Sequence, residues 1–212
     1  TLEGMDVQAY LSDMIRKVYQ HPLIHVSTDS TITRASGYVG NFITNVKSGG
    51  RVREIHHGIT IIATGAEEYK PTEYLYGKDD RVLTLLELEE QIAKGEERLI
   101  NSQSLVMIQC VGCRQEDRNY CSRVCCSQAI KNALKLKEIN PQMDIYILFR
   151  DMRTYGFIED YYREASNRDV KFIRYEPDDK PQVEAVGEDG RRFLRVTVAD
   201  PILGQRLAID TD

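Results

Sequence analysis

Residues 104–150 read SLVMIQCVGCRQEDRNYCSRVCCSQAIKNALKLKEINPQMDIYILFR, and they decide the fold. Two apolar runs, residues 104–110 and 144–150, have the length and composition of buried strands. Between them, residues 127–140 carry apolar side chains at helical spacing, and Pro141 ends that helix. A strand, a helix and a second strand in close succession form one βαβ unit, which requires a parallel sheet. The stretch therefore predicts an α/β domain.

The elements on both sides continue this pattern. Upstream we expect a helix that begins at Val7, short β-rich runs, a buried strand and a helix closed by Gly95; the strand is Ile59–Ala63 and the second helix covers 83–95. Downstream we expect a helix over 158–167, a strand over 170–175, a hairpin over 182–200 that turns at 187–190, and a strand over 206–210. This order predicts two α/β halves that join near residues 95–103.

Charge and hydropathy exclude several classes of function. The chain has 212 residues and a formal net charge of −5, so it has no basic field that would hold a nucleic acid. No apolar run approaches the roughly 18 residues that a membrane span needs, and we expect no direct membrane insertion. The first residues have no targeting pattern. The odd number of cysteines argues against a secreted disulfide framework and fits a reducing cytoplasm better. Thr1 and the strand-like end suggest a piece of a longer protein.

All five cysteines lie between Cys110 and Cys126. Their odd number and the adjacent pair Cys125 and Cys126 argue against a secreted disulfide framework. Thiolates are soft ligands that suit zinc or an iron–sulfur cluster. Because Cys121, Cys125 and Cys126 crowd at the start of one helix, whose N-terminus favours negative charge, the spacing favours a compact cluster.

Three other interpretations of these cysteines stay open. The thiols could be a zinc site that staples an α/β binding module without redox activity. Cys110 and Cys113 have the CxxC spacing of a dithiol oxidoreductase. The third interpretation is a set of free buried thiols, which this concentration of cysteines disfavours.

The same stretch resembles a known family. Residues 106–141, with 144–165 and 170–175, closely resemble the A-type flavoprotein component of heterodisulfide reductase and the A and B flavoproteins of the quinone-interacting membrane-bound oxidoreductase complex. The similarity extends upstream through SGYVGNF (36–42) and IIATGAEEYKP (61–71), so it covers nearly the whole chain. It implies a partial two-dinucleotide-binding, thioredoxin-reductase-like fold.

The resemblance also implies domains and cofactors. Residues 1–97 would be part of an FAD-binding domain without its GxGxxG fingerprint, and residues 98–212 an NAD(P)-binding-like domain with a Rossmann-like βαβ unit. Family positions that hold a 4Fe-4S cluster match Cys110, Cys121, Cys125 and Cys126, and the segment near FAD matches Ala63, Thr64 and Gly65. Cys113 departs from the family, which usually has a small residue there.

In a nicotinamide-binding unit, the loop after the first strand is rich in glycine so that a pyrophosphate can approach the helix. Here the corresponding loop has cysteines and a single glycine, Gly112. We therefore expect a cluster in the place of a dinucleotide, and electrons that arrive from a protein partner.

The resemblance implies an oxidoreductase subunit that relays electrons between FAD and iron–sulfur centres. Its partners would be other subunits of a heterodisulfide-reductase-type complex and ferredoxin-like electron carriers. No side chain is expected to act as acid, base or nucleophile. Arg150 and Arg153 are expected to be exposed loop residues, and His56 and His57 to be solvated surface.

Overall fold

The computed structural model describes residues 5–188 and 191–212. The chain divides into two compact units, of which the first ends at Glu68 and the second begins at Tyr69. Both units mix helices with small sheets, three sheets in the described residues, so the predicted α/β class is confirmed. The finer prediction of a two-dinucleotide-binding fold, with a boundary at residue 97, stays a prediction.

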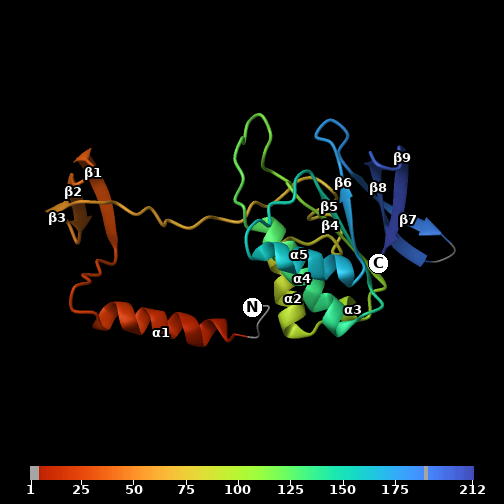
Figure 1. Cartoon of the computed structure of the whole chain (residues 1–212), viewed down its shortest axis with the longest axis horizontal. Helices are drawn as coiled ribbons and strands as arrows, with labels where there is room; N and C mark the ends of the chain where they lie inside the picture. Colours follow the sequence, from red (N-terminus) through yellow and green to blue (C-terminus); the bar gives the residue numbers. More distant parts are fainter. Residues whose placement is uncertain (1–4, 189–190) are drawn as a thin grey trace. The chain divides into compact units, whose positions relative to one another are not determined.

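Within its described residues, the first unit has one helix and one antiparallel sheet (Figure 1). Helix α1, Val7–Gln20, begins where the Asp6 carboxylate accepts hydrogen bonds from the next turn. Strands β1 (Ser30–Tyr38), β2 (Asn41–Ser48) and β3 (Arg51–His57) follow in the order β1-β2-β3. The helix and the β-rich runs are therefore confirmed.

The middle strand β2 carries Thr44, the one buried side chain in the described part of this unit. His57 contacts it: Nε2 of His57 is 2.8 Å from Oγ1 of Thr44, and its ring stacks on Phe42. His56 is exposed as expected, but His57 is half-buried. The expectation that both histidines are solvated was therefore wrong for His57, which packs across the sheet.

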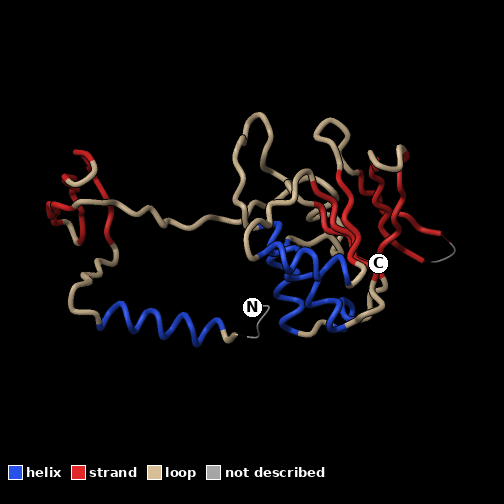
Figure 2. Tube along the Cα trace, in the orientation of Figure 1, coloured by secondary structure: helices blue, strands red, loops and turns tan. Residues whose placement is uncertain are grey.

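The buried strand predicted over Ile59–Ala63 is not present. These residues lie in a loop (Figure 2), and Ile59, Ile61 and Ile62 are 73%, 87% and 81% exposed. Apolar composition alone cannot bury a strand, because a strand also needs neighbours that satisfy its backbone hydrogen bonds. No described strand of the chain pairs with this segment.

The second unit is built on the predicted βαβ pattern. Strands β4 (Ser104–Ile108), β5 (Asp144–Phe149) and β6 (Val170–Arg174) form a parallel sheet in the order β4-β5-β6. Helix α4, Cys125–Ile139, connects the first two strands, and α5, Ile158–Asn167, connects the second pair. Because all three strands run in one direction, their carboxyl ends lie at the same edge of the sheet.

Both faces of this parallel sheet are covered (Figure 1). Helices α4, α5, α2 (Leu85–Lys94) and α3 (Glu97–Ile100) cover one face. An antiparallel sheet, β7 (Gln182–Glu188), β8 (Arg191–Asp200) and β9 (Gln205–Thr211), covers the other. Strand β5 directs Ile145 and Ile147 to the helices and Leu148 to the second sheet, as the period of two in a strand requires.

The predicted ends of several elements agree with the structure. Thr84 and Glu87 form a capping box at the start of α2, and Gly95 ends it with φ +68°. The expected hairpin is the β7–β8 pair, but part of its predicted turn, residues 189–190, lies outside the described residues. The short helix α3 was not predicted. Among the described residues, no helix has the length and apolar character to cross a bilayer.

Candidate metal centre

The cysteine loop connects β4 to α4 at the carboxyl edge of the parallel sheet. Cys110 follows the strand in a left-handed conformation, φ +64°, which turns the chain away from the sheet. Gly112 has φ +66°, and a β-carbon there would stand 2.1 Å from Cε1 of Tyr69. The ring of Tyr69 therefore packs directly on the backbone of the loop, and only glycine fits beneath it. Cys125 and Cys126 lie in the first turn of α4.

The loop holds four of its five thiols in two hydrogen-bonded pairs. Cys113 is hydrogen-bonded to Cys110, and Cys125 is hydrogen-bonded to Cys126. The hydrogen bond with Cys126, then burial, and to a smaller extent the charge of Cys110 raise the pKa of Cys125. The hydrogen bond with Cys110, then burial, and to a smaller extent the charge of Cys121 raise the pKa of Cys113. All five are free cysteines. The loop thus concentrates soft donors from the end of one strand and the start of one helix.

Each hydrogen-bonded pair has one member that ionises more easily. The hydrogen bond from Cys113, with further help from Arg114, lowers the pKa of Cys110 to about 6 against the opposing effect of burial. The hydrogen bond from Cys125 lowers the pKa of Cys126 to about 7. Hydrogen bonding to these acceptors, followed by burial, raises the pKa of Cys113 and of Cys125. Thiolates at Cys110 and Cys126 are the species that bind metal.

The loop after β5 supplies donors to the two thiolates. The backbone N–H of Arg150 donates to Cys110, and that of Arg153 donates to Cys126. Both arginines are half-buried, so the prediction that they are exposed loop residues was wrong. Arg150 and Arg153 are half-buried because the strands are parallel: the loops after β4 and β5 leave the same edge of the sheet and pack on each other.

Four buried side-chain atoms around this edge lack a partner within the described residues: Nε2 and Oε1 of Gln109, Oγ1 of Thr154 and Nε of Arg150. Gln109 and Thr154 are each 2% exposed. Unsatisfied buried polar groups are costly, and each calls for an explanation such as a bound group. Among the described residues, no three His, Cys, Asp or Glu side chains already stand in a metal-binding arrangement. The thiols instead lie in two hydrogen-bonded pairs, Cys110 with Cys113 and Cys125 with Cys126.

The donor chemistry fits an iron–sulfur group. Five sulfur atoms are available, four are needed, and backbone donors already point at two of them. Hydrogen bonds to sulfur and the N-terminus of α4 both compensate the negative charge that such a group carries. Which four cysteines act as ligands stays a prediction.

The predicted flavin segment is in the first unit. Ala63, Thr64 and Gly65 are exposed loop residues, and Gly65 has φ +71° with open space around it. Their assignment to FAD stays a prediction.

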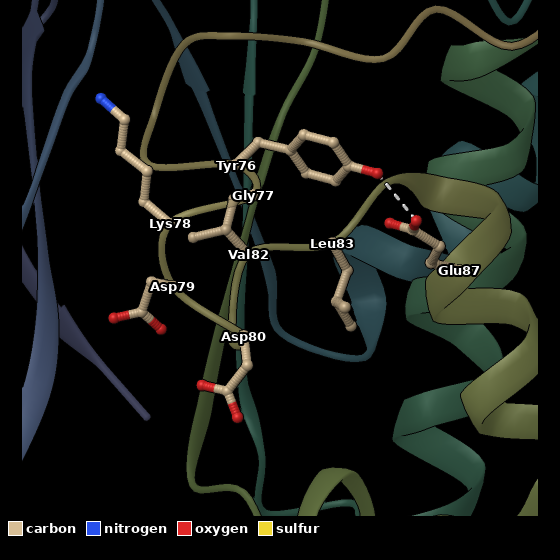
Figure 3. Close-up of a pocket in the computed structure, with 8 residues that line it drawn as sticks. All are labelled: Tyr76, Gly77, Lys78, Asp79, Asp80, Val82, Leu83 and Glu87. Atoms are coloured by element: carbon tan, nitrogen blue, oxygen red, sulfur yellow. Dashed lines mark hydrogen bonds between the residues drawn. The ribbon is translucent and has the colours of Figure 1, made fainter.

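An open hollow beside α2 is lined by residues 76–80, 82, 83 and 87 (Figure 3). Its acidic groups are engaged within the protein: Tyr76 donates to Glu87 across 2.8 Å, Asp79 pairs with Arg81, and Asp80 pairs with Arg98. This hollow contains none of the cysteines. Its contacts stabilise the start of α2.

Sequence reasoning missed three contacts of the site: Tyr69 on Gly112, Tyr175 to the carbonyl of Gln109, and Arg114 between Cys110 and Asp151. The position of Arg114 directly after the CVGC motif was the one local signal available.

Comparison with curated proteins finds related sequences. The chain is 38% identical over 172 residues to the iron–sulfur A component of the CoB–CoM heterodisulfide reductase of Methanocaldococcus jannaschii. It is 39% identical over 171 residues to the A component of the H2/formate:CoB–CoM heterodisulfide,ferredoxin reductase of Methanococcus maripaludis. Each alignment covers 73% of this chain and 25% of the relative, so the chain spans about a quarter of the length of these proteins. No family model matches the chain.

Proposed function

Because this chain belongs to the family of heterodisulfide reductase A components over the aligned segment, we propose that it is part of an oxidoreductase subunit that relays electrons between FAD and iron–sulfur centres. The observation that carries the proposal is that all five cysteines lie between the end of β4 and the first turn of α4, at the carboxyl edge of the parallel sheet. The chain would form the partial FAD domain, 1–97, and the NAD(P)-binding-like domain, 98–212, of a thioredoxin-reductase-like core.

Cys110, Cys121, Cys125 and Cys126 would hold a 4Fe-4S cluster, which supplies one-electron transfer when bound. The backbone N–H groups of Arg150 and Arg153 would remain donors to the sulfurs. Cys110 lies two residues after the end of β4, whereas Cys125 and Cys126 begin α4, so the ends of regular elements would position three of the four ligands.

Ala63, Thr64 and Gly65 would approach FAD in the intact protein. Partners would be other subunits of a heterodisulfide-reductase-type complex and ferredoxin-like electron carriers in the cytoplasm. The names of the relatives point to the same class, since they are reductases of the CoB–CoM heterodisulfide, and the names of two further relatives from Methanosarcina include ferredoxin.

Metal analysis under oxygen-free conditions tests this proposal. Protein purified without oxygen should contain iron and acid-labile sulfide, be brown, and develop an electron paramagnetic resonance signal after dithionite reduction. Colourless protein with one zinc per chain and no sulfide would support the zinc-stapled binding module instead. Zinc binding would also leave the optical spectrum unchanged by dithionite, because zinc has no accessible second oxidation state.

One observation favours a second candidate, a dithiol oxidoreductase. Cys113 donates its hydrogen bond to Cys110, as the second cysteine of a CxxC motif does to a reactive thiolate. In that case Cys113→Ser should abolish thiol–disulfide exchange with a small disulfide. An iron-loaded protein whose electron transfer is unaffected by Cys113→Ser would exclude this candidate.

A further inference from the structure

The guanidinium of Arg114 lies between a cysteine and a carboxylate. Its Nη1 atom is 3.9 Å from Sγ of Cys110, and its Nη2 atom donates to the carboxylate of Asp151. The side chain of Arg114 is only 19% exposed although it belongs to a polar loop. One positive charge is thus held against one sulfur of the proposed metal centre.

Two hydrogen bonds fix the backbone that carries this side chain. The N–H of Arg114 donates to the carbonyl of Tyr120 across 3.1 Å, and Nη1 of Arg150 donates to the carbonyl of Arg114 across 2.6 Å. Arg114 itself has φ +55°, a left-handed conformation that costs a non-glycine residue about 1–2 kcal/mol. An arginine that is merely exposed on a surface loop needs neither a left-handed backbone nor a hydrogen bond from Arg150 to its carbonyl oxygen.

An ordinary surface ion pair is the alternative. Asp151 is 48% exposed, and exposed pairs contribute about 0–1 kcal/mol to stability. That alternative accounts for the contact between Arg114 and Asp151, but it does not account for the position of the other guanidinium nitrogen, Nη1. This atom points at Cys110, which also accepts the backbone N–H of Arg150. Arg150 therefore contacts both the thiolate and the residue that carries the nearby charge.

We infer that Arg114 is a positioning residue of the metal centre. Asp151 holds its guanidinium against Cys110, and Arg150 holds its backbone carbonyl, so that a bound iron–sulfur group is easier to reduce. This role rests on the proposed function. Reduction adds one electron, and a nearby positive charge stabilises the more negative state. Charge and hydrogen bonding at ligand sulfurs are established determinants of such potentials.

Two measurements on the full chain, purified without oxygen, test the inference. In iron-loaded protein, Arg114→Gln should make one-electron reduction about tenfold less favourable, which is a decrease of about 59 mV in midpoint potential. In metal-free protein, Arg114→Gln and Asp151→Asn should each speed hydrogen exchange several-fold in peptides that cover residues 110–121, because the loop loses its anchor.

Arg118→Gln is the matched control, since it removes the same charge from the same loop while its guanidinium lies over the Tyr69 ring, 4.5 Å from the centroid. It should leave the potential near the wild-type value. Arg114→Lys keeps the charge but cannot contact Cys110 and Asp151 at the same time, so its midpoint potential should lie between those of Arg114→Gln and wild type. If Arg114→Gln does not retain iron, the midpoint potential is measured in Asp151→Asn instead.

An unchanged potential in Arg114→Gln at wild-type iron content would overturn the inference, and so would an equal decrease in Arg118→Gln. A wild-type chain that binds no iron contradicts the proposed function. The positioning role is then decided by hydrogen exchange alone, and unchanged exchange in both variants would overturn it.

Discussion

Tyr175 donates its phenolic hydrogen to the backbone carbonyl of Gln109 across 2.6 Å, inside the protein. Tyr175 follows β6 and is 3% exposed, whereas Gln109 is the last residue before Cys110. Burial, followed by the nearby charge of Cys110, raises the pKa of Tyr175, so the phenol stays a donor. The residue that follows β6 is thereby hydrogen-bonded to the first residue of the cysteine loop, Gln109.

Tyr175→Phe should destabilise the metal-free protein by about 1–3 kcal/mol, because it leaves a buried carbonyl without its donor. Urea denaturation measures this change. Tyr155→Phe is the control: Tyr155 is 64% exposed, and its variant should stay within about 0.5 kcal/mol of wild type. Equal stabilities of the two variants would mean that the buried hydrogen bond contributes nothing.

Gly112→Ala should destabilise the protein by more than the conformational cost of its left-handed backbone, which is about 1–2 kcal/mol. The added carbon would stand 2.1 Å from the Tyr69 ring, which must then move. Gly156→Ala is a matched control, because Gly156 has φ +75° but open space around it. The difference between the two variants in thermal denaturation isolates the packing of Tyr69. If both lose the same stability, Tyr69 does not pack on the loop in solution.

Glu87 should make the stability depend on pH at acidic values. Burial opposes its ionisation, but hydrogen bonds from Thr84, Lys70 and Tyr76 outweigh it and lower the pKa of Glu87 from 4.5 to about 2. Its contribution is therefore complete above pH 4.5 and is lost as the pH falls toward 2. Because the side chain is 34% exposed, solvent screening reduces the contribution to about 1 kcal/mol.

Glu87→Gln removes this charge and keeps the capping box at the start of α2. The free energy of unfolding, measured by urea denaturation, should fall less between about pH 5 and pH 3 in Glu87→Gln than in wild type. The pKa of Asp79 is also lowered to about 2, chiefly by the hydrogen bond from Arg81, so some pH dependence should remain. Glu90→Gln, on the exposed face of α2, should keep the wild-type slope; an equal change of slope in both variants would contradict the assignment.

Removing a ligand should reduce the iron content more than removing Cys113. Cys126→Ser takes a buried thiolate from the first turn of α4 and should lose most of the iron and sulfide. Cys113→Ser should retain both, because four other cysteines remain. Iron and sulfide per chain, measured without oxygen in both variants, test this difference. Loss of iron in Cys113→Ser with retention in Cys110→Ser would instead make Cys113 the fourth ligand.

Periodicity and composition alone were sufficient for the βαβ unit, for the helices α1, α2, α4 and α5, and for the thiols at the junction of β4 and α4. These features depend on neighbours within a few residues, so a local pattern of apolar spacing, glycine and proline determines them. The prediction for Ile59–Ala63 was wrong for the complementary reason. A strand forms only against partner strands, and apolar composition does not provide them.

Only the tertiary structure decided which groups surround the cysteines. Tyr175 and Gln109 are 66 positions apart in the sequence, and Arg114 and Asp151 are 37 apart. Each pair meets because the parallel strands bring their carboxyl ends to one edge, where successive loops pack together. Residue types and spacing determined that thiols would gather after β4, whereas strand register and burial determined the charge and hydrogen bonds that each thiol receives.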